Sequence, residues 1–232
     1  MKKNNSVKAD VSGLAAKGAA VDLFNMDCME LMAKYPDKHF DLAIVDPPYG
    51  NYKIKENSSV KMFDNNEPPK EYWDELIRVS KNQIVWGINY FQNVKLTGGA
   101  IIWNKLGQDT KRRKQAPTIS EAEIAYQSFN NLVKMFSYAW IGNITGHNYQ
   151  INSPEFANRI HPTEKPIALY NWIYQNYAEP KQKILDTHLG SGSSAISAYY
   201  FDINFVGCEI DKEYFYSAQK RFKDATAQTV LF

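Results

Sequence analysis

The sequence predicts an α/β protein with a mostly parallel sheet and helices on both faces. Short apolar runs bounded by turn residues recur along the chain, as expected for buried strands. Segments with apolar residues at helical spacing separate many of these runs. Because parallel neighbours are joined by crossovers, usually helices, this alternation is typical of a parallel sheet covered on two sides.

The first half of the chain begins this alternation. Residues 20–24 and 40–45 are predicted strands, and 28–35 is a predicted helix between them. Asp46-Pro47-Pro48 ends the second strand, because proline has no N–H for a sheet ladder. Residues 50–69 are polar and are predicted to form a mobile loop beside that strand end. A helix over 70–81 and strands over 83–86 and 100–103 are predicted to follow.

The second half of the chain continues the alternation of predicted strands and helices after a less regular middle third. Residues 119–127 and 132–141 favour β structure, whereas 104–118 and 142–160 are polar, basic and rich in asparagine, glycine and proline. Pro166 suits the first turn of a helix that runs to about Tyr177. The remaining predicted elements are a strand over 183–186, a helix over 192–200, a strand over 204–208 and a helix over 211–223.

Length and composition exclude several classes of protein. The 232 residues suit one domain or a domain with an insert, and 44% hydrophobic with 22% charged residues is ordinary globular composition. No apolar run approaches the ~18 residues of a membrane span, so no membrane association is expected. The basic start, MKKNNSVKAD, lacks the apolar core of a secretory signal, and a cytoplasmic location is expected. The net charge of only +2 does not identify a nucleic-acid-binding protein by itself.

Metal and disulfide chemistry have little support in the sequence. The two cysteines, Cys28 and Cys208, form no C-x-x-C motif and are expected to be reduced and buried. The four histidines lack the spacing of metal ligands, and no metal is expected. The motifs G-x-S-x-G and G-x-x-x-x-G-K-[ST] are absent as well, which disfavours serine hydrolases and P-loop proteins.

A glycine-containing loop indicates a nucleotide-type cofactor. Residues 186–193, DTHLGSGS, follow a predicted strand and open a predicted helix, and their glycines allow close backbone approach to a ligand. The pattern G-x-G-x-x-G is incomplete, because Ala195 occupies its third position. Glu209 ends the next strand 19 residues after Gly190, where an acid usually binds ribose hydroxyls. Together these features favour an adenosine-containing cofactor, and the alternative is a glycine turn with a solvated acid.

The segment Asp46-Pro47-Pro48-Tyr49 predicts chemistry on the exocyclic amine of a base. Such an amine is a poor nucleophile until two acceptors draw its protons out of conjugation with the ring. The Asp46 carboxylate and the Pro47 carbonyl could be those acceptors, and the prolines would hold them in place. Tyr49 could stack on a base that has left the helix. The alternative is a proline-terminated strand with a core tyrosine.

In these motifs the sequence resembles the amino-methylating DNA methyltransferases that use S-adenosylmethionine, whose catalytic motif is [DNS]-P-P-[YFW]. Residues 161–166, HPTEKP, resemble the H-P-[TS]-x-K-P segment of the beta class. The catalytic motif precedes the cofactor loop, as in that class. The resemblance implies a Rossmann-like methyltransferase sheet with a circularly permuted motif order. It also implies S-adenosylmethionine as cofactor, with S-adenosylhomocysteine as its product.

The resemblance also implies roles for individual residues. Asp46, Pro47, Pro48 and Tyr49 would be catalytic, with Asp46 also bordering the cofactor. Asp186, Gly190 and Gly192, with His188 and Ser193 of the same loop, would line the methionine portion, while Glu209 would hold the ribose. Asp27 and Cys28 would border the adenine. Lys165, with Thr163 and Pro166, would lie against the methionine end, where an ammonium could meet a carboxylate. The sequence departs from the family's D-P-F-x-G-S-G loop, because His188 and Leu189 replace Pro-Phe.

The predicted domain organisation follows the same resemblance. Residues 1–18 are a predicted flexible arm, 19–103 the catalytic half, 104–160 a target-recognition insert and 161–232 the cofactor-binding half. The basic residues expected to bind phosphates are Lys105, Lys111, Arg112, Arg113, Lys114 and Arg159. The residues that could read base edges are Gln108, Asn143, Asn148 and Gln150. The alternative is a solvated loop.

The sequence therefore predicts a site-specific DNA adenine-N6 methyltransferase. Cytosine-N4 methylation is the nearest alternative, and Asp46 favours adenine because enzymes for that target usually carry aspartate there. RNA methylation, a non-catalytic DNA-binding relic of the fold and a nicotinamide oxidoreductase are further alternatives. An aromatic-rich segment around Trp172, Tyr174 and Tyr177 fits a homodimer interface and fits a core helix equally well. Origins in a phage and in a restriction-modification system are both compatible with this sequence.

Overall fold

The computed structural model describes residues 18–50, 66–92, 94–106, 120–141, 144–146, 150–151, 160–161 and 163–227, with only the backbone at 141, 144–146 and 150–151. The predicted arm and most of the predicted loop at 50–69 lie outside these ranges. None of the helices in them is long and apolar enough to cross a membrane.

The order of the elements confirms the predicted alternation of strands and helices. The strands are β1 (Val21–Asn25), β2 (Phe40–Val45), β3 (Ser80–Trp86), β4 (Gly99–Asn104), β5 (Ala122–Gln127), β6 (Val133–Ser137), β7 (Ala139–Ile141), β8 (Ile144–Gly146), β9 (Gln150–Ile151), β10 (Lys183–Asp186) and β11 (Asn204–Glu209). The helices are α1 (Cys28–Met32), α2 (Lys70–Val79), the 3-10 turn η1 (Ile88–Tyr90), α4 (Ile167–Tyr177), α5 (Ser193–Tyr200) and α6 (Lys212–Ala227).

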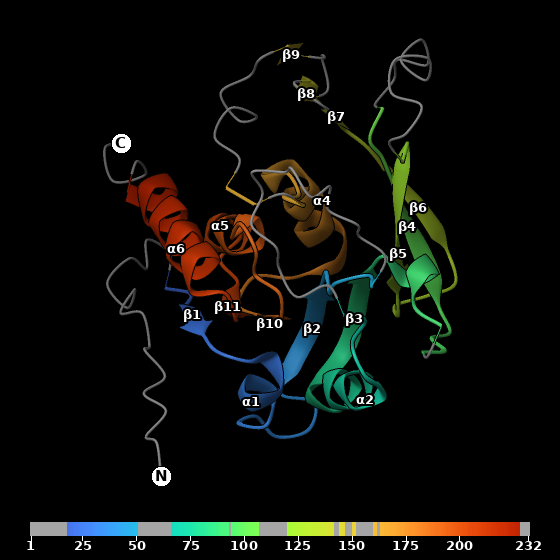
Figure 1. The fold of residues 1–232 in the computed structure, drawn as a ribbon, viewed down its shortest axis with the longest axis vertical. Coiled ribbons are helices and arrows are strands. Elements are labelled where there is room, and N and C mark those ends of the chain that lie inside the picture. Colours follow the sequence, from blue (N-terminus) through green and yellow to red (C-terminus); the bar gives the residue numbers. More distant parts are fainter. Residues whose placement is uncertain are drawn as a thin grey trace.

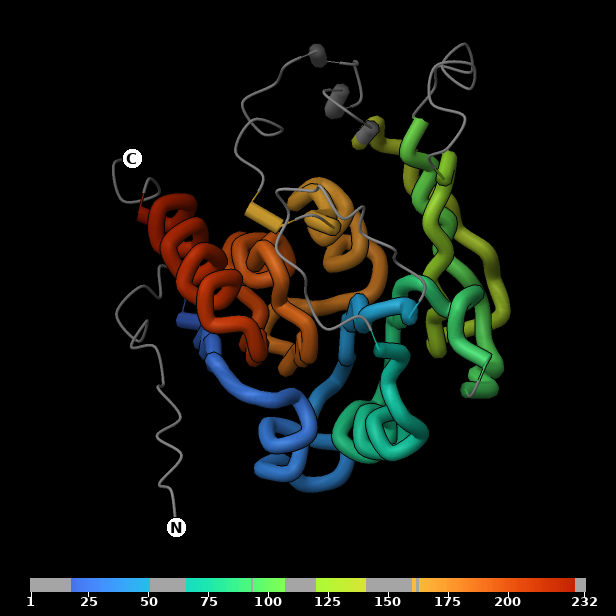
Figure 2. The backbone as a smooth tube through the Cα atoms, viewed as in Figure 1, coloured from blue at the N-terminus to red at the C-terminus, as the bar shows by residue number. Residues whose placement is uncertain are grey.

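Eight strands form one sheet in the order β1-β11-β10-β2-β3-β5-β4-β6 (Figure 1). The strands from β1 to β3 pair in parallel, and only β5 runs antiparallel to its neighbours. The first strand, β1, pairs with the last, β11, and Figure 2 shows the blue start of the described chain close to its red C-terminal helix, α6. The chain leaves β10 toward β11 and leaves β2 toward β3, in opposite directions along the sheet. Ligands bind at such a switch point in open α/β sheets.

Helices cover both faces of this sheet, as predicted. Successive residues of β2 alternate between two hydrophobic clusters, with Leu42 and Ile44 in one and Ala43 and Val45 in the other. The first cluster contains the apolar faces of α4, α5 and α6, and the second contains those of α1 and α2. The sheet is therefore sandwiched between two helical layers, which leaves its carboxyl edge open for a site.

Helix α2 ends two residues before the predicted boundary. Ser80 is fully buried and extended, and its hydroxyl donates to the Leu76 carbonyl at 2.5 Å. The Ser80 backbone N–H donates to the same carbonyl, so the last bond of the helix comes from the first residue of β3 and the strand starts directly where the helix ends. Helix α1 is also shorter than predicted, because it ends at Met32.

The predicted insert contributes to the main sheet. Strand β5 pairs with β3 and β4, and β6 pairs with β4, so residues 122–137 form part of the eight-stranded sheet. Strands β7, β8 and β9 form a separate three-stranded sheet. The range 104–160 therefore does not stand apart as a whole, because the apolar side chains of its first strands complete the core. Its role in target recognition stays a prediction.

The aromatic residues of α4 belong to the core. Tyr174 is 1% exposed and Tyr177 8% exposed, and both lie in the cluster beneath α5. Trp172 packs against that cluster beside Phe136, with ring centroids 5.6 Å apart. These contacts within one chain account for the aromatic character of the segment. The homodimer stays a prediction without support from these residues.

Candidate active site

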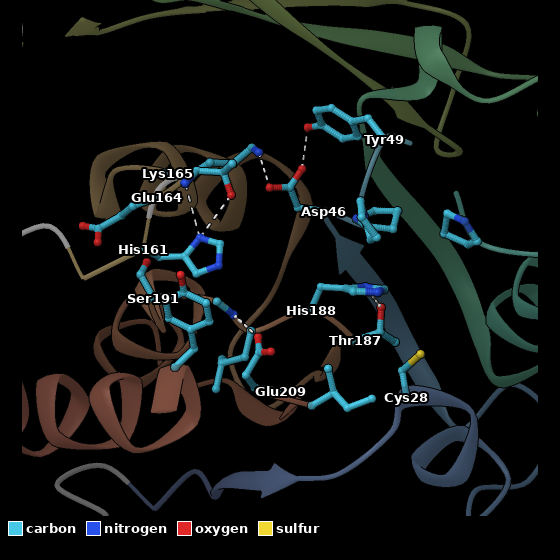
Figure 3. A pocket seen from close by; sticks show the side chains of 18 of the residues that line it. Cys28, Asp46, Tyr49, His161, Glu164, Lys165, Thr187, His188, Ser191 and Glu209 are labelled. Carbon is cyan, nitrogen blue, oxygen red and sulfur yellow. Dashed lines mark hydrogen bonds and ion pairs between the residues drawn. The ribbon is translucent and has the colours of Figure 1, made fainter. Parts of the chain in front are cut away.

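A cavity of about 1110 Å³ lies at the switch point between β10 and β2 (Figure 3). Five predicted segments line it: the loop after β2, the segment before α4, the loop after β10, the end of β1 and the end of β11. The predicted site residues in its wall are Asp27, Cys28, Asp46, Pro47, Pro48, Tyr49, Lys105, Thr163, Lys165, His188, Gly190, Ser193 and Glu209. Residues far apart in sequence thus meet in one cavity, as the three motifs predict.

Both carboxylate oxygens of Asp46 have partners. Tyr49 donates its hydroxyl to Oδ1 at 2.6 Å, and the Lys165 ammonium pairs with Oδ2 (Figure 3). Burial, together with the charge of Asp46, raises the pKa of Tyr49 well above its ordinary value, so the hydroxyl stays a donor. The parallel strand β2 therefore delivers Asp46 to the cavity as an oriented acceptor.

The ring of Tyr49 is fixed between aromatic and backbone groups. It stacks on Tyr90, with centroids 4.9 Å apart and planes 18° apart. The backbone of Gly87, at φ +71, lies against the ring, since a Cβ there would come 2.1 Å from Tyr49 Cε1. Gly87 was not among the predicted site residues, although its place directly after a predicted strand was a signal in the sequence. Stacking of Tyr49 on a flipped base stays a prediction.

Lys165 lies in the cavity wall and pairs with the catalytic segment. Its side chain is 4% exposed, and its ammonium pairs with Asp46 and lies 3.3 Å from Glu123 Oε2. The ammonium also lies 5.5 Å from the centre of the Trp86 ring. The expectation that Lys165 lies against the methionine end of a cofactor stays a prediction, and in this structure two protein carboxylates pair with its ammonium.

Lys105 pairs with the same carboxylate, Glu123, that contacts Lys165. Its ammonium lies 2.9 Å from Glu123 Oε1, and its side chain is 15% exposed. The expected phosphate-binding role of Lys105 needs an accessible cation, and this structure places the cation in the cavity wall. Glu123 was missed by sequence analysis, because an acid alternating with apolar residues on a strand gives no sign of the partner that it faces.

Asp186 holds the glycine loop in place without lining the cavity. Its side chain is buried, and it accepts from the Ser194 hydroxyl at 2.6 Å and from the His188 N–H at 3.0 Å. Gly192, at φ +75, begins α5, where a Cβ would lie 3.3 Å from Ala218 Cβ. Pro166 caps the start of α4. These three predicted cofactor residues do not line the cavity but shape the segments that do.

The buried carboxyl of Asp186 makes stability depend on pH. Burial raises its pKa from 3.8 to about 7, although the bond from Ser194 opposes this shift. A carboxyl with a raised pKa stabilises the fold at low pH, and this contribution is lost as pH rises through about 7. We expect Asp186→Asn to gain stability relative to wild type between about pH 4 and 8, by up to about 4 kcal/mol.

Urea unfolding of both proteins at a series of pH values measures this difference. His161 and His188 titrate in the same range, because burial lowers the pKa of each to about 4. Their protonation lowers the free energy of unfolding as pH falls. Both proteins contain these histidines, so the effect cancels in the difference. A difference that stays constant with pH would contradict the buried, proton-binding carboxyl.

Glu209 lies where a ribose-binding acid is expected. Its Oε2 accepts from the Gly190 N–H at 2.9 Å and its Oε1 from the Asp211 N–H at 3.0 Å. Burial raises its pKa, and the two backbone bonds oppose that shift. Across the cavity, Asp27 caps α1 by accepting from the Met29 N–H at 2.8 Å. Both carboxylates therefore face the cavity with fixed orientations.

The two cysteines are free thiols, as expected. Cys208 is fully buried and Cys28 is half-buried beside the cavity. Burial, together with the charge of Asp27, raises the pKa of Cys28 to about 12, so the thiol is not an activated nucleophile.

An internal ion pair connects the segment before α4 with the glycine loop. Glu164 is fully buried, and its Oε1 lies 3.0 Å from an Arg221 nitrogen. Arg221 also donates to the Ser191 carbonyl at 3.0 Å and to the Ser193 hydroxyl at 2.9 Å. Helix α6 therefore fixes the segment that carries Lys165 relative to the cofactor loop. Sequence analysis did not identify this pair.

Most of the expected DNA-binding residues lie outside the described part of the chain. These are Lys111, Arg112, Arg113, Lys114, Arg159, Gln108, Asn143 and Asn148, and the side chain of Gln150 is not described either. Within the described residues, no group of three or more His, Cys, Asp or Glu side chains could hold a metal ion.

Comparison with known proteins identifies the family. A family model described as DNA methylase (N6_N4_Mtase) matches residues 101–220, just over half of the chain. The chain belongs to this family of DNA methylases. The matched range contains Lys165 and the glycine loop but begins after Tyr49, so the D-P-P-Y motif supports the assignment independently.

Individual proteins are similar to most of the chain. The Type II methyltransferase M2.MboI of Moraxella bovis is 21% identical over 241 residues, which cover 88% of each protein. The structure of M1.HpyAVI in complex with SAM has a TM-score of 0.52 and 21% identity, covering 86% of this chain and 98% of that one. PvuII DNA methyltransferase (cytosine-N4-specific) has a TM-score of 0.55 and 12% identity, covering 90% and 92%. These structural likenesses confirm the Rossmann-like methyltransferase fold.

Proposed function

We propose that this DNA methyltransferase transfers a methyl group from S-adenosylmethionine to the N6 amine of an adenine in DNA. The observation that carries the proposal is the meeting of Asp46 to Tyr49 with the glycine loop and Glu209 in one cavity at the sheet's switch point. A volume of about 1110 Å³ exceeds the range of ~300–1,000 Å³ usual for one small-molecule ligand. The cavity therefore has room for a cofactor and a flipped base together.

The residues in the cavity wall fit the cofactor. The Glu209 carboxylate lines the cavity and would bind ribose hydroxyls, and Asp27 and Cys28, which also line it, would border the adenine. Gly190 and Ser193 of the glycine loop would border the methionine portion. When bound, the cofactor supplies an electrophilic methyl group on a sulfonium sulfur.

Asp46 has the principal role in the proposed reaction. The target amine donates one proton to Asp46 Oδ1, in place of the Tyr49 hydroxyl, and the other to the Pro47 carbonyl. This geometry directs the nitrogen lone pair at the methyl group. As the new N–C bond forms and the S–C bond breaks, the amine proton becomes acidic and leaves toward Asp46. Tyr49, released from Asp46, is free to contact the base.

Aspartate at the first motif position favours adenine over cytosine. Serine is commoner at that position in the resembling cytosine-N4 enzymes, while Asp46 is present here. The mechanism is the same for both targets, because each presents an exocyclic amine. The choice between the two bases is therefore part of the proposal and needs a direct test.

Product analysis tests the reaction and the base together. The purified protein is incubated with mixed-sequence DNA and methyl-labelled S-adenosylmethionine, and the digested nucleosides are identified by mass spectrometry. We expect labelled N6-methyladenine. Labelled N4-methylcytosine would retain the mechanism and change the base. If label were found in RNA assayed in parallel but not in DNA, the substrate would be RNA and the proposal of a DNA substrate would be wrong.

Calorimetry separates the remaining alternatives. S-adenosylmethionine and NAD are titrated into the protein in separate experiments. We expect binding of the former only. Binding of NAD would indicate an oxidoreductase using the loop at Gly190, and binding of neither would indicate a non-catalytic relic of the fold.

A further inference from the structure

Four charged side chains form a continuous network behind the catalytic segment. We call Asp46, Lys165, Glu123 and Lys105 the Lys165 network. The Lys165 ammonium lies between the carboxylates of Asp46 and Glu123, and Glu123 lies between the ammonium groups of Lys165 and Lys105. The four side chains come from the loop after β2, the segment before α4, strand β5 and the end of β4. No single sequence motif contains them.

Burial makes the pairing of these charges energetically important. The Lys165 side chain is 4% exposed, and Oε2 of Glu123 is buried. Removing one partner of a buried ion pair leaves an uncompensated charge, which costs several kcal/mol. The network contains two cations and two anions, so the set is neutral as long as every member is ionised. Lys165 thus depends on Glu123 as well as on Asp46.

The network leaves one defined position on Asp46 for the substrate. Lys165 occupies Oδ2, while Oδ1 holds the exchangeable Tyr49 hydroxyl. Rotation of the carboxylate would break the contact with Lys165, and movement of Lys165 toward Asp46 alone would leave Glu123 with Lys105 only. Glu123 therefore restrains the cation that in turn restrains Asp46.

We infer that Glu123 is a positioning residue for methyl transfer, which with Lys105 holds the Lys165 ammonium on Asp46 and so presents Oδ1 to the target amine. This inference rests on the proposed function, because it assigns a role in that reaction. It also reassigns Lys165, since the lysine acts on Asp46 and not on the methionine end of the cofactor.

The charges around Lys165 determine the sign of a pH effect. Burial alone would lower the pKa of Lys165, but Asp46 and Glu123 outweigh it and raise the pKa above its ordinary value. The other ionisable groups of the described residues that interact with this cluster include Lys105, His161, His188, Tyr49, Tyr170 and Asp186. Loss of the Glu123 charge removes one of the two charges that raise the pKa of Lys165, while burial still lowers it. The pKa of Lys165 must then fall, and the ammonium is lost at lower pH.

The test compares wild type with Glu123→Gln in steady-state methylation of DNA by labelled S-adenosylmethionine. We expect kcat to fall by about tenfold to a hundredfold. The KM values for DNA and S-adenosylmethionine should change by less than about threefold. In the variant, the alkaline decline of kcat should begin at a lower pH than in wild type, because only Asp46 still raises the pKa of Lys165. A role in folding alone would not move this alkaline limb.

Two further variants keep the inference testable. Glu123→Asp retains the charge with a shorter side chain, so we expect a reduced kcat with the alkaline limb near that of wild type. Glu71→Gln is the matched control, because Glu71 is exposed on α2 outside the cavity and its variant should behave as wild type. If Glu123→Gln is too unstable to assay, Glu123→Asp decides through its kcat, and an unchanged kcat would overturn the positioning role.

The outcomes separate this inference from the proposed function. Wild-type protein without methyl transfer would overturn the proposed function. Active wild type with an unchanged kcat and alkaline limb in Glu123→Gln would overturn the positioning role. Calorimetry of Lys165→Gln with S-adenosylmethionine provides the last distinction. An unchanged Kd supports action on Asp46, whereas a loss of affinity of about tenfold or more would return Lys165 to the cofactor's carboxylate.

Discussion

Asp46→Ala is expected to abolish methyl transfer while leaving binding of S-adenosylmethionine nearly unchanged. The carboxylate supplies the acceptor that orients the target amine, and Pro47 alone cannot hold both of its protons. Asp46→Asn keeps one oxygen but loses the charge that pairs with Lys165. We expect its kcat to fall by about a hundredfold to a thousandfold, the range measured when one catalytic hydrogen-bonding group is removed. Labelled-methyl assays give kcat, and calorimetry gives the cofactor Kd.

The matched control is Asp74→Asn on the exposed face of α2. Asp74 pairs with Lys70 four residues earlier, and both side chains are largely exposed, so this pair contributes little to stability. The control should keep full activity. Near-normal turnover in Asp46→Ala would show that the site has been assigned to the wrong carboxylate.

Gly87→Ala is expected to have the second-largest effect on turnover. A Cβ at this position would lie 2.1 Å from Tyr49 Cε1, and the φ of +71 is unfavourable for any other residue. The ring of Tyr49 must then leave Tyr90, and its hydroxyl must leave Asp46. We expect kcat to fall by about a hundredfold, because a displacement of ~1 Å at a catalytic group costs that much.

Gly18→Ala separates strain from displacement of Tyr49. Gly18 has a similar φ of +85, but a Cβ there would meet only the flexible end of Lys181, at 3.3 Å. Thermal unfolding should show that the control also loses stability, while methylation assays should show unchanged turnover. Equal activity losses in both variants would mean that strain, and not the position of Tyr49, explains the effect.

The order of the elements could be predicted from the sequence because it depends on local patterns. Strands such as Lys183–Asp186 and Phe40–Val45 have the predicted bounds, since a short apolar run between turn residues fixes both ends. The boundary between α2 and β3 could not be placed. Ser80 ends the helix through a buried bond to Leu76, and the apolar pattern runs through both elements.

The order and pairing of the strands beyond β3 could not be predicted from the sequence. Strand β5 inserts between β3 and β4, although it follows β4 in the chain. The antiparallel pairing of Ile84 with Gln127 depends on which edges of the sheet remain free after folding. A pattern of β-favouring residues indicates a strand but not its neighbours, so these residues were assigned to an insert.

The chemistry of the site could be predicted from the sequence, because each motif is contiguous. The three motifs are residues 46–49, residues 161–166 and the loop at Gly190. The partners of these residues could not be predicted. The Asp46 to Lys165 contact spans 119 residues, and the Arg221 to Ser193 contact spans 28. Such pairs arise only when parallel strands bring their carboxyl ends to one edge of the sheet.

The sequence by itself determined the family, the order of strands and helices, and the motifs that carry the proposed methyl transfer. Each of these depends on residues that are close in the sequence, where local sterics and hydrophobic periodicity decide the structure. Only the tertiary structure decided that Lys165 pairs with Asp46, that Glu123 and Lys105 complete its network, and that Gly87 supports Tyr49. The physical reason is that buried charges and close backbone contacts are set by the order of strands in the sheet, which no single segment specifies.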